Sequence, residues 1–347
     1  MSSAATARPA RPVYPFVAIV GQEEMRRTLI LTAIDPAIGG VMIMGHRGTG
    51  KSTAVRALAE VMPPLIAVEG CPFHCAPGTT VGLCEYCTNE GSARTVEMQV
   101  PVVDLPLGAT EDRVAGTLDI EQALAHGRRR FEPGVLARAN RGFLYIDEVN
   151  LLEDHLIDLL LDVAASGVNT VEREGISVRH PAHFSLIGSG NPEEGELRPQ
   201  LLDRFGLGAT IETEREPALR VEIIRRRLAF DADPSGFVAH WAADTATLRN
   251  RIGAAQRYLP EVVVPEPALS TIAALTSTLA LDGHRGDLTL ARAARAHAAF
   301  EHRPTVTIED LRSVAPLALR HRLRTDPFTL DTPSDTVETT FDRIVPG

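Results

Sequence analysis

The chain has 347 residues and a formal net charge of −10, with 44% hydrophobic and 23% charged residues. These values are ordinary for a globular protein with one large and one small domain, or with two medium ones. The negative charge argues against nucleic acid as the main partner, and no stretch approaches the ~20 uninterrupted apolar residues that span a bilayer. Residues 1–12 lack the apolar core of a secretory signal and are short for an organelle transit peptide, so we expect a flexible tail over residues 1–14 of a cytoplasmic protein.

The first ordered segment predicted from the sequence, residues 16–22, is apolar and leads into a helical run through Thr32. Residues 41–44 are predicted to form a short buried strand and residues 53–61 a helix, which Pro63 and Pro64 end. Between them residues 45–52 have the sequence GHRGTGKS, a complete G-x-x-x-x-G-K-[ST] phosphate loop. The alternative is a chance match in a glycine-rich turn, which the flanking strand and helix disfavour.

The chemistry of this loop predicts a site for a nucleoside triphosphate with magnesium. Glycines let several backbone N–H groups point at the phosphates, and the helix that follows adds its dipole. Lys51 supplies a positive charge to the outer phosphates, and the Ser52 hydroxyl is a magnesium ligand. The loop residues expected to contact the nucleotide are Gly45, Gly48, Thr49, Gly50, Lys51, Ser52 and Thr53.

Residues 65–100 are irregular and hold all four cysteines of the chain, Cys71, Cys75, Cys84 and Cys87. Their spacing, C-x₃-C followed after eight residues by C-x₂-C, favours a tetrahedral Cys₄ zinc site that staples an insertion over residues 68–95. Two disulfides, which a reducing cytosol disfavours, and four free thiols are the alternatives.

Regular secondary structure is predicted again from the apolar segment 102–108, and a helix is predicted over residues 119–130. Residues 142–146 form an apolar strand that ends in Asp147 and Glu148, the Walker B pattern, and a helix is predicted over residues 153–165. Beside a phosphate loop, Asp147 reaches the magnesium and Glu148 polarises the attacking water. The alternative is a pair of solvated acids at the start of the next helix.

Residues 167–181 are predicted to form a β-hairpin with Glu174 and Gly175 in its turn. An apolar strand over residues 184–188 follows, and Asn191 just after it is expected to hold the lytic water near the γ-phosphate, although Asn before Pro is also a common turn starter. Strands that alternate with helices imply a parallel sheet covered on both faces. The hairpin carries mixed charge, which disfavours a nucleic-acid motor.

From about residue 214 amphipathic helical runs replace the strands, over roughly 216–230, 244–259, 266–280, 287–300 and 307–324. This order of motifs resembles the AAA+ ATPases. The resemblance implies that Val20 and Gly21 line the adenine pocket, the alternative being a plain turn into a helix. It also implies that Arg204 reaches the ATP of a neighbouring subunit, the alternative being a surface pair with Asp203, and that Arg285 contacts ATP from the second domain.

Longer stretches resemble one AAA+ family closely, the I subunit of magnesium chelatase. They include "LPLGATEDRVAGTLDIEQAL" and "GSGNPEEGELRPQLLDRFG", which are more specific than the ATP motifs, and the likeness spans most of residues 15–325. It implies an α/β AAA+ core with a parallel sheet and inserted β-hairpins over residues 15–215, linking helices over 216–260 and a C-terminal all-helical bundle over 261–347.

The same resemblance implies that the chain hydrolyses MgATP in a homo-oligomeric ring, a hexamer. Its partners would be the D subunit and the porphyrin-binding H subunit of the chelatase, which inserts Mg²⁺ into protoporphyrin IX in chlorophyll or bacteriochlorophyll synthesis. No nucleic acid and no membrane span are expected. The alternative function is that of a remodelling ATPase of the MoxR or cobaltochelatase type, with no link to chlorophyll.

Overall fold

A five-stranded parallel sheet forms the centre of the molecule in a computed structural model that describes residues 12–78, 84, 86–87, 94–118, 131–173, 176–195, 199–323 and 332–345. The strand order is β11-β1-β10-β7-β4, and all four neighbouring pairs are parallel. The strands are β1 (Gly40–Gly45), β4 (Val102–Leu105), β7 (Gly142–Ile146), β10 (Phe184–Gly190) and β11 (Phe205–Ile211). The predicted parallel sheet is therefore confirmed.

Every residue of β7 and β10 is buried, as expected for strands with helices on both faces. Successive side chains alternate between two apolar cores: Tyr145 and Ile187 face α1 (Glu23–Ile34) and α2 (Lys51–Leu58), whereas Leu144 and Leu186 face α6 (Val135–Ala139) and α7 (Asp154–Ser166). This alternation follows from the two-residue period of a strand. The predicted helices over residues 53–61 and 153–165 correspond to α2 and α7, with shifted ends.

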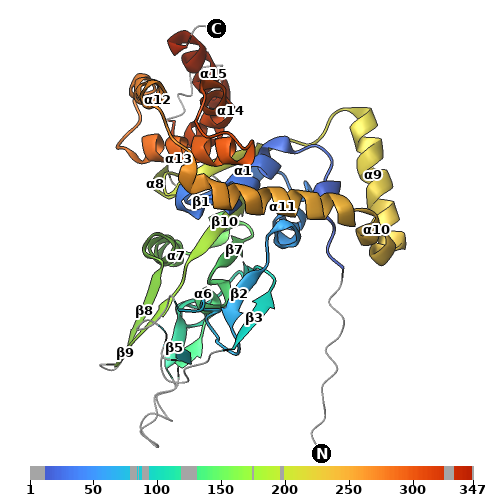
Figure 1. Cartoon of the computed structure of the whole chain (residues 1–347), viewed down its shortest axis with the longest axis vertical. Helices are drawn as coiled ribbons and strands as arrows, with labels where there is room; N and C mark the ends of the chain where they lie inside the picture. Colours follow the sequence, from blue (N-terminus) through green and yellow to red (C-terminus); the bar gives the residue numbers. More distant parts are fainter. Residues whose placement is uncertain are drawn as a thin grey trace, which may run out of the picture.

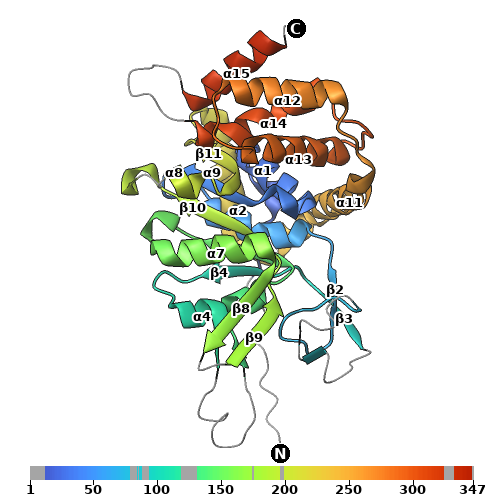
Figure 2. The same cartoon turned by 90° about the vertical axis from the view of Figure 1, so that its left-hand side faces the viewer.

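Three antiparallel hairpins lie beyond the sheet, at the bottom of Figures 1 and 2. They are β2 (Leu65–Val68) with β3 (Thr95–Met98), β5 (Gly116–Leu118) with β6 (Phe131–Pro133), and β8 (Val168–Arg173) with β9 (Ile176–Pro181). The predicted hairpin over residues 167–181 is confirmed as β8–β9, whereas its turn, Glu174 and Gly175, lies outside the described residues. The helix predicted over 119–130 lies outside them too. The prediction that residues 65–100 are irregular is wrong at both ends of that segment, where β2 and β3 pair.

After β11 the regular secondary structure of the described chain is helical. They are α9 (Pro217–Ala232), α10 (Pro234–His240), α11 (Ala242–Tyr258), α12 (Glu266–Thr278), α13 (Arg285–Phe300), α14 (Ile308–Leu319) and α15 (Pro333–Ile344). Helices α4 (Glu111–Ala115) and α8 (Pro199–Leu202) are short, and the 3₁₀ turns are η1 (Phe16–Ala18), η2 (Pro36–Ile38), η3 (Ala59–Val61), η4 (Val149–Leu151), η5 (Pro192–Glu194), η6 (Leu259–Glu261) and η7 (Arg320–Arg322).

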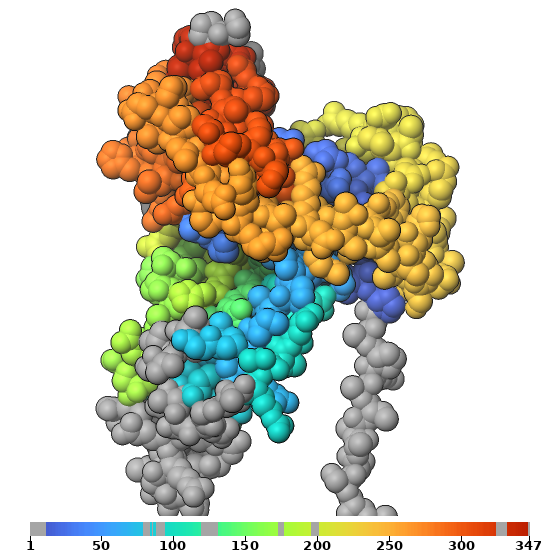
Figure 3. All heavy atoms as spheres, viewed as in Figure 1, coloured from blue at the N-terminus to red at the C-terminus, as the bar shows by residue number. Residues whose placement is uncertain are grey.

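The predicted helical tail is therefore confirmed, with α10 and α15 as additional helices. Helices α9 and α10 (yellow in Figure 3) protrude at one side, while α12 to α15 stack above the sheet and share its apolar core through α1. The exact domain boundaries stay a prediction. Among the described residues, no helix combines the length and apolar character needed to cross a bilayer.

Candidate functional site

The candidate site lies at the carboxyl edge of the sheet, where β1, β10 and β7 end side by side. Strand β10 pairs with both of the others: Met44 is opposite Gly190, and Gly188 is opposite Ile146. The phosphate loop, Asn191 and Asp147 follow directly after these three strand ends. The sequence predicted three separate motifs, and the fold brings them to one edge.

The phosphate loop has the conformation that its glycines predict. Gly48 and Gly50 have φ angles of 77° and 83°, which a side chain would strain, and a Cβ on either would meet nothing within 4 Å. The glycines are therefore needed for the backbone path. Helix α2 begins at Lys51, directly behind the loop, and the Thr49 hydroxyl donates to the His46 carbonyl at 2.9 Å.

Lys51 lies folded over the loop. Its Nζ donates to the carbonyl of Gly45 and, at 3.0 Å, to that of His46. Partial burial lowers the pKa of Lys51, while the nearby carboxylates of Asp147, Glu148 and Glu194 oppose this shift. The lysine thus faces a cluster of acidic groups across the site, which is the arrangement expected where Mg²⁺ and phosphate charges have to be balanced.

Asp147 is held by two hydroxyl groups that the sequence did not single out. Its Oδ1 accepts hydrogen bonds from the Tyr145 hydroxyl at 2.9 Å and from the Ser189 hydroxyl at 2.7 Å, and these two hydroxyl oxygens are 3.1 Å apart. Burial is the main cause that raises the pKa of Tyr145, so the phenol stays a donor. The sequence held a signal for both hydroxyls. Tyr145 stands two residues before Asp147 and Ser189 two residues before Asn191, and residues two apart lie on the same face of a strand.

Glu148 has a left-handed backbone with φ of 58°, and its N–H donates to Ser189 Oγ at 3.2 Å. Its carboxylate forms an ion pair at 3.3 Å with Arg47 of the phosphate loop, and Arg47 also pairs with Glu194. This arginine was not predicted as a site residue. With this unusual backbone conformation, the side chain of Glu148 reaches Arg47 of the phosphate loop.

Asn191 is buried at the end of β10, with 3% of its surface exposed. Its Oδ1 accepts from the Glu193 N–H at 3.2 Å, which caps η5. The turn-starter interpretation is therefore correct in geometry, and it does not conflict with a role for the amide beside the phosphates.

The N-terminal segment that contains Val20 and Gly21 contacts the phosphate loop through its next residue, because Gln22 Nε2 donates to the Thr49 carbonyl. Gly21 has a φ of 65° and lies near Glu214, whose Oε2 would be 3.3 Å from a Cβ at that position. The segment therefore contacts the phosphate loop, and the role of Val20 and Gly21 in the adenine pocket stays a prediction.

Two candidate arginines have acidic partners within the chain. Arg204 Nη1 lies 2.9 Å from Asp162 Oδ1 and 3.8 Å from Asp158 Oδ1, both on α7. Arg285, at the start of α13, contacts the carbonyl and carboxylate of Asp203 at 3.2 and 3.5 Å. The alternative Arg204–Asp203 pair is wrong, because Asp203 is engaged by Arg285 and by Arg322, a residue that sequence reasoning missed.

Sequence identity to known proteins shows the family of this chain. The chain is 60% identical over 318 residues to the "Magnesium-chelatase 38 kDa subunit" of Acidiphilium rubrum, covering 91% of this chain and 92% of the relative. It is 54% identical over 343 residues to the "Magnesium-chelatase subunit ChlI" of Nostoc sp., covering 98% and 92%. This chain belongs to the magnesium-chelatase ChlI family.

Other comparisons agree with membership of the ChlI family. The family "Magnesium chelatase, subunit ChlI" matches residues 117–200, and "AAA lid domain" matches residues 269–340. The structure of a complex between subunits BchI and BchD of magnesium chelatase has a chain 55% identical to this one, with a TM-score of 0.56 over 94% of this chain and 100% of that one. A crystal structure from Cytophaga hutchinsonii, 18% identical with a TM-score of 0.60, covers 93% and 89% and shares the fold.

In this ChlI-family chain the four cysteines lie apart from the nucleotide edge. Their sulfur atoms are within 4.8 Å of one another. The cluster lies beside the residues that precede β7, because Arg141 donates to the carbonyl of His74, which stands between two of the cysteines.

Proposed function

We propose that this chain is the ATP-hydrolysing motor subunit of a magnesium chelatase, and that its turnover drives the insertion of Mg²⁺ into protoporphyrin IX. The observation that carries the proposal is the meeting of Lys51, Asp147 and Asn191 at one sheet edge, in a chain 60% identical to a magnesium-chelatase subunit. MgATP is the substrate of this chain, and the porphyrin is held by another subunit. The names of the relatives favour this function over a remodelling ATPase.

The phosphate loop supports the binding of the triphosphate. The positive φ angles of Gly48 and Gly50 turn the backbone around the site, and α2 points its N-terminus at the same place. Lys51 would exchange the carbonyls of Gly45 and His46 for phosphate oxygens. Thr49 and Thr53 flank these groups in the loop and in the first turn of α2.

Ser52 and Asp147 would hold the Mg²⁺ that accompanies ATP. Hydroxyl and carboxylate oxygens are the hard ligands that this ion prefers. The hydrogen bonds from Tyr145 and Ser189 fix the orientation of the Asp147 carboxylate before the metal arrives. Such preorganisation keeps the ligand from having to rearrange during turnover.

Glu148 would polarise the water that attacks the γ-phosphate, and Asn191 would help to position it. Both side chains follow strand ends next to the phosphate loop, and Glu148 is already paired with Arg47 of that loop. A general base of this kind contributes typically 10²–10⁴-fold to the rate.

The two arginines would complete the site in an assembled ring of this chain. Arg204 would leave Asp158 and Asp162 to stabilise the charge on the ATP of a neighbouring subunit, and Arg285 would contact ATP from the helical domain. Both are exposed enough for this, with 37% and 52% of their side-chain surface accessible. ATP hydrolysis would then require assembly, and we propose a hexamer.

The partners would be the D and H subunits of the chelatase. The solved complex of BchI with BchD, which contains a chain 55% identical to this one, supports the first of them. The H subunit would hold the porphyrin, because the described site residues of this chain serve only the ATP chemistry.

A reconstituted reaction tests the proposal. The purified chain is mixed with D and H subunits, MgATP and protoporphyrin IX, and the magnesium porphyrin is followed by its fluorescence. Product is expected only when the chain and ATP are both present. Steady ATP hydrolysis without magnesium porphyrin, with partners shown to be competent by a known I subunit, would contradict the chelatase function and favour a remodelling ATPase.

A further inference from the structure

The four cysteine sulfurs have the spacing of a metal-binding tetrahedron. Cys71 Sγ lies 3.8 Å from Cys84 Sγ and 3.6 Å from Cys87 Sγ, and all four sulfurs lie within 4.8 Å of one another. Zn–S bonds of about 2.3 Å place tetrahedral sulfurs about 3.8 Å apart, whereas a disulfide needs about 2.05 Å. The geometry therefore matches ligands around a common ion and not two disulfides.

Three of the four cysteines are buried in a small apolar core of their own, and Cys87 is half-buried beside it. Cys75 and Cys84 are fully buried, Cys71 is 5% exposed, and Val68, Phe73 and Ala137 pack around them. A loop this short has little apolar area with which to stabilise itself, so a bound metal would supply the missing free energy.

The backbone around the first two cysteines is shaped to turn both sulfurs inward. The Cys71 N–H donates to the Val68 carbonyl at 3.2 Å, and the Val68 N–H donates to the Cys75 carbonyl at 2.9 Å. Gly70 and His74 have φ angles of 75° and 48°, so two left-handed residues bracket the turn. Glycine adopts this conformation without strain, so only His74 has an unfavourable backbone conformation in the turn that brings Cys71 and Cys75 together.

We propose that Cys71, Cys75, Cys84 and Cys87 bind one structural Zn²⁺, a site independent of the proposed ATP chemistry. Four thiolates fill the tetrahedral coordination of zinc and leave no position for a substrate, so the site is structural. Soft thiolates also select against Mg²⁺, which prefers oxygen ligands, and this separates the site from the metal substrate of a chelatase.

Two side chains that stand before β7 contact the loop that carries Cys71 and Cys75, which we call the zinc loop. Buried Asn140 donates to the Phe73 carbonyl at 2.5 Å and accepts from the His183 N–H at 2.8 Å. Arg141 donates to the carbonyls of Ile66 and His74 at 2.7 and 3.1 Å. Asn140 and Arg141 stand just before β7, the strand that Asp147 follows.

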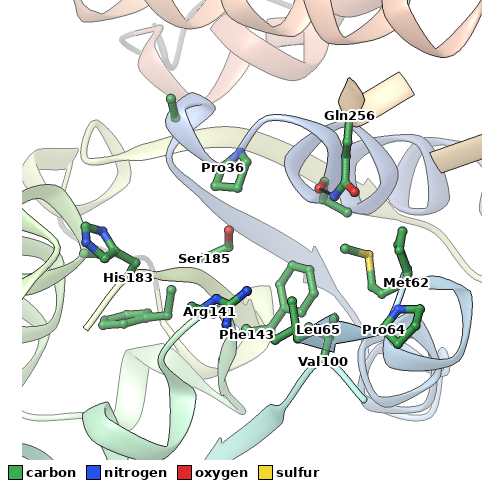
Figure 4. A pocket seen from close by; sticks show the side chains of 16 residues that line it. Pro36, Met62, Pro64, Leu65, Val100, Arg141, Phe143, His183, Ser185 and Gln256 are labelled. Atoms are coloured by element: carbon green, nitrogen blue, oxygen red, sulfur yellow. Dashed lines mark hydrogen bonds between the residues drawn. The ribbon is translucent and has the colours of Figure 1, made fainter. Parts of the chain in front are cut away.

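The ring of Phe73 adds a second connection, since it stacks on His180 of the β8–β9 hairpin with centroids 4.7 Å apart. Figure 4 shows the amino edge of the sheet, where Arg141, Phe143 and Ser185 line a cavity of about 450 Å³. Through Asn140 and Arg141 the zinc loop is hydrogen-bonded to the residues that precede β7 and β10, at the edge opposite to the nucleotide site.

Metal analysis of the full chain, purified without chelator, tests the proposal. We expect about one zinc per chain and its release when a mercurial thiol reagent titrates the four cysteines. Replacement of zinc by Co²⁺ should give the absorption bands of tetrahedral thiolate coordination. A zinc-free chain with four titratable thiols, a mass that reveals disulfides, or iron in place of zinc would each overturn the proposal.

Two variants distinguish a zinc ligand from a residue that only lies near the zinc ligands. Cys84→Ser should reduce the zinc content at least fivefold, whereas His74→Asn should retain it, because His74 lies between two ligands without being one. Asn tolerates the left-handed backbone at this position. Zinc lost from His74→Asn and kept in Cys84→Ser would overturn the assignment. The metal content of the unmodified chain decides even where Cys84→Ser does not fold, and neither result depends on ATP hydrolysis.

Discussion

The Ser189 hydroxyl donates a 2.7 Å hydrogen bond to the carboxylate of Asp147, joining the ends of two neighbouring strands. The same Ser189 oxygen accepts from the N–H of Glu148 at 3.2 Å. One serine thus positions both acids of the Walker B pair. The acids themselves were predicted from the sequence, whereas this support for them was not.

Ser189→Ala should therefore lower the rate of ATP hydrolysis with little change in nucleotide affinity. The loss of a hydrogen bond to a charged group costs roughly 1.5–3 kcal/mol, which predicts a decrease in kcat of about tenfold or more. Steady-state kinetics and a fluorescent-nucleotide titration measure the two effects. Ser185→Ala, at the other end of β10, is the control and should leave both unchanged.

Glu148→Gln should bind MgATP as the unmodified chain does but hydrolyse it 10²–10⁴-fold more slowly, roughly the contribution of a general base. Lys51→Ala should instead weaken nucleotide binding, because it removes the charge that meets the outer phosphates. Isothermal titration with ATP and a phosphate-release assay separate the two phenotypes. Normal hydrolysis by Glu148→Gln would mean that another group activates the water.

Arg204→Ala should bind ATP normally and lose turnover, by roughly 10³-fold or more if it acts as an arginine finger. If it acts on a neighbour, mixing Arg204→Ala with Lys51→Ala should restore part of the activity, because some interfaces then pair an intact phosphate loop with an intact arginine. A mixture no more active than its components would assign Arg204 to its own subunit or to structure.

The fold should become less stable as the pH decreases, because burial keeps His321 in its uncharged form. Its Nε2 lies 3.1 Å from the Phe205 carbonyl and its Nδ1 is buried, and burial lowers the pKa to about 3 from 6.5. Between these values the unfolded chain binds more protons, so the free energy of unfolding decreases as the pH falls below 6.5.

The loss between pH 7 and pH 5 from this group alone is about 2 kcal/mol. Urea unfolding at both pH values measures it, and His321→Gln should show the smaller decrease. An equal decrease in the two proteins would assign the acid sensitivity to other groups.

The nucleotide motifs were predictable because each is a local pattern, and the apolar runs before Asp147 and Asn191 identified their strands. Strand β11 was not predicted, because Gly206 and Gly208 weaken the strand signal and are there for close approach: a Cβ on Gly206 would lie 2.2 Å from the Ile38 carbonyl oxygen. The partners of Arg204 and Asp203 were not predictable either, since they come from helices distant in the sequence.

The support of Asp147 by Ser189 depends on the strand order, in which β10 lies between β1 and β7. No local pattern gives that order, because the strands are separated by long connections. The same holds for the cysteines: their spacing indicated a metal site, but only the folded chain shows four sulfurs within 4.8 Å and the contacts of Asn140 and Arg141 with the loop.

The most direct test of the central claim measures ATP hydrolysis and magnesium-porphyrin formation in the same reconstituted sample, for the unmodified chain and for Glu148→Gln. The variant should lose both activities together while it still binds MgATP and its partners. Undiminished metal insertion by Glu148→Gln without ATP hydrolysis would show that hydrolysis by this chain does not drive the insertion of Mg²⁺.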